Sequence, residues 1–272
     1  MAVETTIFSN NSVDTWFRDI MSDCVLCPRA CHVNRLAGQT GYCGQTAELM
    51  AARASLHYWE EPCISGTSGS GTVFFSGCNL RCVFCQNHNI ALGKAGRVIA
   101  PEHLAEIFLQ LQEQRANNIN LVTPTHFLPQ IVIALEQAKQ QGLHLPIVYN
   151  TGSYESPEAL RHLEGLVDIY LPDLKYFSPE LSTAYSHAPD YFEAACAAIA
   201  EMYRQVGNPV INEDTGLMQR GLIVRHLLLP GQTKDSKKIL RYLHETYGDH
   251  IYISIMNQYT PLPQVADIEA LN

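Results

Sequence analysis

Short apolar runs and amphipathic segments alternate along the chain from residue 72 onward. The segment 101–114 has its apolar residues at the helical spacing i, i+3, i+4 and i+7, and Pro101 occupies a favoured first-turn position. Further helices are predicted at residues 127–142, 156–165, 190–207 and 236–248. The apolar runs predict buried strands at residues 72–77, 119–123, 146–150, 167–174, 221–231 and 251–257.

This alternation of six strands with helices is typical of an α/β protein whose parallel sheet is covered by helices. A doubly wound sheet and an open barrel both fit, and periodicity alone does not distinguish them. The region before it is different, because it is rich in loops and cysteines and ends in a glycine/serine run at 66–71. We therefore predict a cysteine-rich amino-terminal extension at residues 1–70 and an α/β domain at residues 71–272.

The composition is that of an ordinary globular protein, with 46% apolar and 17% charged residues among 272. Acidic residues number 27 and basic residues 18, and the resulting charge of −9 argues against a general nucleic-acid or anionic-membrane partner. No stretch approaches the roughly 18 apolar residues of a membrane span, and the first residues do not read as a signal peptide. We expect a cytoplasmic protein that binds neither nucleic acid nor membrane.

The nine cysteines are distributed unevenly, and eight of them lie between Cys24 and Cys85. This distribution favours metal ligation over a disulfide framework. Cys78, Cys82 and Cys85 follow the first predicted strand with the spacing C-x3-C-x2-C. A 4Fe–4S cluster held by three thiolates keeps one iron free to take a small molecule. The alternative is a structural zinc knuckle that recruits a remote cysteine such as Cys63.

The segment 77–87, GCNLRCVFCQN, resembles the signature loop of the radical S-adenosylmethionine (radical SAM) superfamily, with Phe84 in the usual aromatic place before the last cysteine. The stretches CPRACHVNR, HYWEEPCISG, NINLVTPTH, YLPDLKYF and RHLLLPG resemble a branch described as pyruvate formate-lyase activating enzyme-like. The resemblance covers residues 72 to about 260. It implies the partial (β/α)6 TIM-like barrel of the superfamily.

The resemblance also implies a reaction. Cys78, Cys82 and Cys85 would ligate a 4Fe–4S cluster, and the amino and carboxylate groups of S-adenosylmethionine would chelate its fourth iron. One electron, expected from a flavodoxin- or ferredoxin-type donor, would split the carbon–sulfur bond. The resulting 5′-deoxyadenosyl radical would abstract hydrogen from a protein, peptide or small-molecule substrate. Activation of a glycyl radical enzyme lies within this expectation.

Polar residues follow the predicted strands, and barrels bind their ligands at strand carboxyl ends. The candidate cofactor-binding residues, besides Phe84 and the three cysteines, are Thr123, Thr125, Asn150, Asp173, Lys175 and Arg225. The two threonines replace a Gly-Gly-Glu-type motif of many relatives, and Asp173 with Lys175 resembles the D-x-K of activating enzymes. Arg225 and His226 are adjacent in a strand, so only one of them faces the barrel interior. A salt bridge or a satisfied barrel residue is the alternative for each.

Four earlier cysteines, Cys24, Cys27, Cys31 and Cys43, form the pattern C-x2-C-x3-C-x11-C. Four thiols make a closed set that suits structural zinc or a second iron–sulfur cluster. The site is therefore either a cap that folds on metal binding or an auxiliary cluster that passes electrons or contacts substrate.

Two other functions stay open at this stage. The chain is either a non-catalytic metal-binding barrel module or a degenerate radical SAM relative that holds a cluster without turnover. The chain ends soon after the sixth predicted strand, at residue 272, so a truncated carboxyl terminus is a further alternative.

Overall fold

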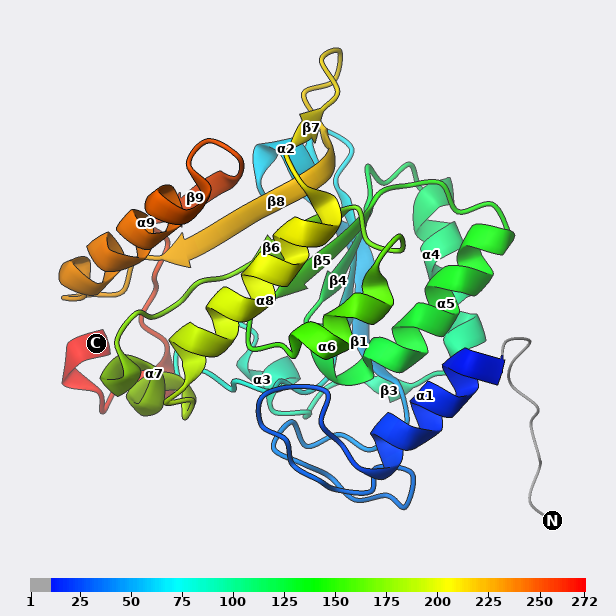
Figure 1. Ribbon diagram of the computed structural model, residues 1–272, viewed down its shortest axis with the longest axis horizontal. Coiled ribbons are helices and arrows are strands. Elements are labelled where there is room, and N and C mark those ends of the chain that lie inside the picture. The colour runs from blue at the N-terminus through cyan, green and yellow to red at the C-terminus, as the bar shows by residue number, and fades with distance from the viewer. Residues whose placement is uncertain (1–10) are drawn as a thin grey trace.

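The computed structural model describes residues 11–272, in which a mixed sheet is flanked by helices (Figure 1). Residues 1–10, which belong to the predicted extension and to the stretch without signal-peptide character, lie outside the described residues. The strands are β1 (Met50–His57), β2 (Ser70–Phe75), β3 (Arg97–Val98), β4 (Ile119–Val122), β5 (Ile147–Thr151), β6 (Ile169–Pro172), β7 (Val210–Ile211), β8 (Met218–Leu227) and β9 (Tyr252–Met256).

The central strands are parallel, in the order β2, β4, β5, β6, β8, and β9 adds to β8 in parallel. These are the six predicted strands. The sheet stays open, because one end carries β1 and β3 and the other carries β7 and β9. The α/β fold with an unclosed parallel sheet, predicted as a partial barrel, is therefore confirmed.

The amino-terminal segment contributes more regular structure than its sequence pattern indicated. Helix α1 (Asn11–Ser22) contacts α5, and β1 pairs antiparallel with β2. β1 has the sequence MAARASLH, in which residues 52–57 alternate between apolar and polar, but most of the apolar ones are alanine and none is fully buried. The period-2 signal is therefore weak, and backbone pairing with β2 and β3 contributes much of what holds this strand.

The helices lie mainly where amphipathic segments were predicted, and α5, α6 and α8 cross one face of the sheet in Figure 1. Beyond α1 they are α2 (Pro62–Ser65), α3 (His88–Ala91), α4 (Pro101–Glu113), α5 (Leu128–Gln140), α6 (Pro157–Leu160), α7 (Pro179–Ser186), α8 (Tyr191–Val206) and α9 (Thr233–Tyr247), with 3-10 turns at Thr125–Phe127, Arg161–Leu163, Pro263–Val265 and Glu269–Leu271. Ser156 caps α6 by accepting a hydrogen bond from the backbone of Ala159, as its position predicts. Within residues 11–272 no helix has the length and apolar character needed to cross a membrane.

Both faces of the sheet are buried, and each packs against its own hydrophobic core. Leu121 and Tyr149 belong to the larger core between sheet and helices, whereas Val148 and Ile169 belong to a smaller core with Ile64 of α2. Successive strand residues point to opposite faces of the sheet. Every second residue after Val148 and Ile169 therefore lies on the same face as these two residues. This alternation points polar side chains inward at the carboxyl ends of the strands.

We expect Leu121→Ala to destabilise the chain by about 2–5 kcal/mol, because Leu121 is fully buried on the central strand β4 and the substitution leaves a cavity. Leu36→Ala is the matched control, since Leu36 is 47% exposed and should change stability by no more than about 0.5 kcal/mol. Denaturant titration of the metal-free chain measures both. Equal effects of the two substitutions would contradict the packing described.

Candidate functional site

The loop that carries the cysteine triplet begins directly after β2 and is packed from both sides. Gly77 has a φ of +90°, and a Cβ at this position would approach the Cys43 carbonyl oxygen to 2.8 Å and the Gln45 side chain to 2.6 Å. On the other side the backbone N–H of Val83 donates to the carbonyl of Tyr185, at 2.9 Å. The loop is thus held between the amino-terminal segment and α7.

A cavity of about 360 Å³ lies at the carboxyl edge of the sheet. Cys78, Cys82 and Cys85 line it from the loop after β2. Most of the polar residues predicted from strand ends line the same cavity, namely Thr123, Asn150, Asp173, Lys175 and Arg225. The volume lies in the range typical of small-molecule sites, about 300–1,000 Å³.

None of the nine cysteines forms a disulfide; within the triplet Cys82 is buried, and Cys78 and Cys85 are half-buried. Burial raises the pKa of Cys78, and burial followed by the charge of Cys82 raises the pKa of Cys85 to about 12. The Ser186 hydroxyl donates to Cys82 Sγ at 3.0 Å, and the Leu80 N–H donates to Cys78 Sγ at 3.4 Å. Without a cation Cys78 and Cys85 keep their protons, and a bound metal would stabilise their thiolates.

Phe84 lines the cavity and belongs to an aromatic cluster behind the thiols. Its ring makes edge contacts with Tyr176, Tyr185 and Tyr259, with ring centroids 6.3 to 6.4 Å apart. Such T-shaped pairs add about 0.5–1.5 kcal/mol beyond the area they bury. The cluster fixes the end of the loop and limits water access to the thiols.

Arg225 is the centre of a buried polar network opposite the thiols. Its guanidinium donates to Asp173 at 2.8 Å, to Asn150 at 2.7 Å and to Glu60 at 3.1 Å. Lys175 donates to the second oxygen of Asp173 at 2.6 Å. Burial alone would raise the pKa of Asp173, but the two cations lower it below its ordinary value. Arg225 rather than its neighbour therefore faces the cavity.

His226 faces the opposite side of β8. Its Nδ1 lies 2.7 Å from the carbonyl oxygen of Leu174, and its Nε2 lies 2.9 Å from Ser236 Oγ on α9. The pleat of the strand turns Arg225 toward the cavity and His226 away from it, so only one of these two adjacent residues enters the barrel, as predicted.

Thr125 does not line the cavity, although it was predicted as a cofactor-binding residue. It lies in the 3-10 turn after β4, and its hydroxyl donates to Glu155 Oε1 at 2.6 Å. Thr151 donates to the same oxygen, and Glu155 Oε2 has no partner within residues 11–272. Burial raises the pKa of Glu155 to about 7, although hydroxyl hydrogen bonds oppose the shift.

Sequence reasoning did not single out Glu155 or assign a role to His126. Glu155 follows Thr151 by four residues in a loop, and no spacing rule marks a lone acid there. His126 is the last residue of the stretch NINLVTPTH, and its place after a strand does not by itself indicate a ligand. Its imidazole is 3% exposed and lines a second cavity.

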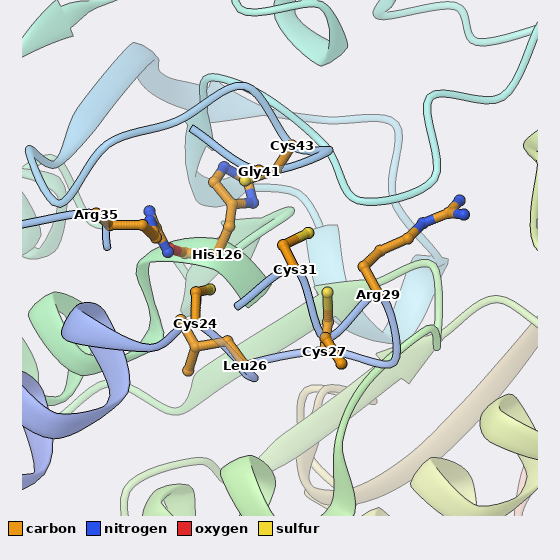
Figure 2. A pocket seen from close by; sticks show the side chains of 10 residues that line it. Cys24, Leu26, Cys27, Arg29, Cys31, Arg35, Gly41, Cys43 and His126 are labelled. Atoms are coloured by element: carbon orange, nitrogen blue, oxygen red, sulfur yellow. The ribbon is translucent and has the colours of Figure 1, made fainter. Parts of the chain in front are cut away.

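This second cavity, of about 20 Å³, brings together the four amino-terminal cysteines (Figure 2). Cys24, Cys27, Cys31 and Cys43 line it together with Arg29, Arg35 and His126. Across residues 11–272 no three His, Cys, Asp or Glu side chains already converge to ion-binding distance. Ligation would therefore require the thiols of either set to rotate toward a common centre.

Arg29 connects the two cysteine-containing loops. Its guanidinium donates to the carbonyls of Asn79, at 2.9 Å, Ser186, at 2.8 Å, and His187. It also lies over the ring of Tyr42, 3.9 Å from the centroid. Because Asn79 follows Cys78, this side chain joins the amino-terminal loop to the loop of the triplet.

We expect Glu155→Gln to change how stability depends on pH. The folded state raises the carboxyl pKa from 4.5 to about 7, so it binds more protons than the unfolded state between these values. The contribution of Glu155 is therefore full below about pH 4.5 and lost as pH rises through 7. Relative to the original chain, the variant should gain roughly 2–4 kcal/mol between pH 5 and pH 8.

The exposed Glu158→Gln variant serves as the control and should follow the original chain at every pH. Denaturant titrations at several pH values measure the effect. Parallel stability curves for all three proteins would show that Glu155 is not the buried, protonated group described.

Three known proteins show how far the similarity of this chain extends. MJ0674 of Methanocaldococcus jannaschii, described as uncharacterized, is 28% identical over 90% of this chain. A pyruvate formate-lyase-activating enzyme of Clostridium pasteurianum is 30% identical over 42% of this chain. The solved structure of anSMEcpe with bound AdoMet covers 69% of this chain at 15% identity, with a TM-score of 0.47. The chain spans 68%, 48% and 50% of these proteins, respectively.

A sequence family gives the stronger assignment. Residues 72–243, which begin in β2 and end in α9, match the family described as the Radical SAM superfamily. The match includes the cysteine triplet and five of the strands that form the cavity edge. The chain belongs to the radical SAM superfamily, whose members use a 4Fe–4S cluster to cleave S-adenosylmethionine.

Proposed function

We propose that this chain is a radical SAM enzyme in which Cys78, Cys82 and Cys85 hold the 4Fe–4S cluster. The observation that carries the proposal is the convergence of these three thiols and the Arg225 network on one cavity of about 360 Å³. The residues fit the cofactors, because soft thiols face charged and amide groups across a space large enough for a small molecule. When bound, the reduced cluster supplies the electron that cleaves S-adenosylmethionine to methionine and a 5′-deoxyadenosyl radical.

The polar side chains of the cavity would orient the cofactor. Lys175 donates one of its three protons to Asp173, so the others can bind a carboxylate. Arg225 presents its guanidinium from β8 and holds Asp173 and Asn150, whose oxygens suit an ammonium group. Thr123 lines the same wall, whereas Thr125 acts behind it through Glu155. Phe84 would keep water from the thiols.

Substrate would enter past the segment between β1 and α2. Trp59 lines the cavity and is 89% exposed, while Glu60 beside it faces Arg225. A protein, peptide or small molecule is the proposed hydrogen donor, with activation of a glycyl radical enzyme supported by the partial similarity to the Clostridium enzyme. A flavodoxin- or ferredoxin-type protein is the proposed electron donor.

The remaining assignments rest on the cysteines. We assign residues 1–70 to a metal-binding extension and residues 71–272 to the barrel. Cys24, Cys27, Cys31 and Cys43 are proposed to hold zinc or a second iron–sulfur cluster, since all four line one cavity. None of the nine cysteines forms a disulfide, which supports the proposal that the protein is cytoplasmic.

Anaerobic reconstitution with iron and sulfide, followed by dithionite and S-adenosylmethionine, tests the function directly. We expect release of 5′-deoxyadenosine and methionine, and loss of this release in Cys82→Ala because the cluster loses a ligand. Cys196→Ala is the control and should retain it, since Cys196 lies on α8 away from the cavity. Cluster absorbance without cleavage would instead indicate a degenerate relative, and zinc alone would indicate a non-catalytic module.

The cofactor assignment predicts a specific effect of Lys175→Ala. Loss of a charged hydrogen bond should weaken S-adenosylmethionine binding about 10- to 100-fold, while cluster absorbance persists. The exposed Lys94→Ala variant should bind as the original chain does. Equilibrium binding to the reconstituted protein measures both, and an unchanged Kd in the Lys175 variant would exclude this contact.

A further inference from the structure

The cavity of the four amino-terminal cysteines also contains a histidine from the barrel. His126 lies in the 3-10 turn after β4, and its ring extends into the cavity toward Cys43 (Figure 2). The cysteines come from the loop between α1 and β1, so the cavity joins two regions that are far apart in sequence. A site built this way takes donors from both the extension and the barrel.

The hydrogen bonding of His126 defines what its free nitrogen can do. Nε2 lies 2.7 Å from the carbonyl oxygen of Ser76, and a carbonyl only accepts, so Nε2 carries the proton. In the neutral ring Nδ1 then holds a lone pair. No partner for Nδ1 exists among residues 11–272, although the side chain is 97% buried. A buried acceptor without a partner is destabilising, and a ligand would offset this cost.

The size of the cavity limits what this ligand is. Its volume is about 20 Å³, against about 360 Å³ for the cavity at the triplet. About 10–15 Å³ holds one water molecule, so the smaller cavity accommodates a single ion. A four-iron cube with its bridging sulfides would require larger movements of the surrounding side chains than a single ion does. Thiolates and a neutral imidazole form the donor set that zinc prefers in structural sites.

We propose that this cavity is a mononuclear zinc site in which His126 Nδ1 is one ligand and cysteines of the amino-terminal loop supply the others. The inference rests on the proposed amino-terminal metal site and defines its metal, its nuclearity and its ligand from the barrel. Three thiolates, a neutral imidazole and Zn²⁺ carry a net charge of −1. Arg35 lines the cavity and acts electrostatically on Cys43, so its charge compensates that of the site.

The site would fix the start of the triplet loop. Through Nε2, His126 holds Ser76, which precedes Cys78 by two residues. The carbonyl of His126 accepts a hydrogen bond from Arg35 at 2.7 Å, and Arg35 also donates to Thr46 at 2.6 Å. A hydrogen bond from a metal-bound histidine to a carbonyl is the usual way to orient such a ligand. The zinc is therefore a positioning element for the loop that carries the radical cluster.

Zinc-edge X-ray absorption of the full-length chain tests this directly. We expect one zinc per chain, with three sulfur scatterers at about 2.3 Å and one nitrogen at about 2.0 Å. The Cys82→Ala variant should give the same spectrum, because it changes only the triplet. A shell of four sulfurs without nitrogen, iron at this site, or no bound metal would overturn the proposal.

Competition with a chromophoric chelator gives a second readout. His126→Asn should lower zinc affinity at least about tenfold, while the exposed His144→Asn should leave it unchanged. Unchanged affinity in the His126 variant would also overturn the proposal. The two proposals can fail independently. The predicted zinc shell without release of 5′-deoxyadenosine would reject only the radical reaction. Release of 5′-deoxyadenosine without that zinc shell would reject only the zinc ligand set.

Discussion

The parallel pairing of β2, β4, β5, β6 and β8 is the constraint on which the rest of this structure depends. It brings the carboxyl ends of all five strands to one edge, so residues separated by about 150 positions face the same space. The pleat then decides which side chains enter that space, and it points Arg225 inward while His226 packs against α9. Backbone pairing therefore positions the polar side chains at this edge, although the pairing itself involves none of them.

The cavity contains both cationic and anionic side chains, and these form a network rather than isolated ion pairs. Arg225 and Lys175 face Asp173 and Glu60, and burial raises the pKa of Glu60 even though Arg225 opposes the shift. Buried ion pairs of this kind seldom add much net stability, because desolvation offsets their attraction. In this cavity the ion pairs fix the orientation of the charged side chains, since each of these side chains is held by at least one other. A zwitterionic ligand such as S-adenosylmethionine would meet a surface whose charges are already positioned.

The sequence predicted the features that depend on local pattern. The triplet spacing, the six parallel strands and the strand-end residues Asn150, Asp173 and Lys175 all follow from periodicity or motif, and the structure brings these residues together. Glu155 could not be predicted, because its significance comes from burial beneath Thr125 and Thr151. The free nitrogen of His126 was equally hidden, since only the folded chain places it beside cysteines about 80 to 100 positions earlier. Strand β1 was not predicted because its alternating residues are mostly alanine and give only a weak apolar signal.

The central claim is that three side chains hold the cluster and leave one iron open to S-adenosylmethionine. Mössbauer spectroscopy of anaerobically prepared, iron-57-loaded protein, recorded without and with S-adenosylmethionine, tests it most directly. The account predicts a 4Fe–4S cluster in which one iron of the four changes its isomer shift when the cofactor is added. A spectrum that shows no such cluster, or a cluster whose four irons are unaffected by the cofactor, would contradict it.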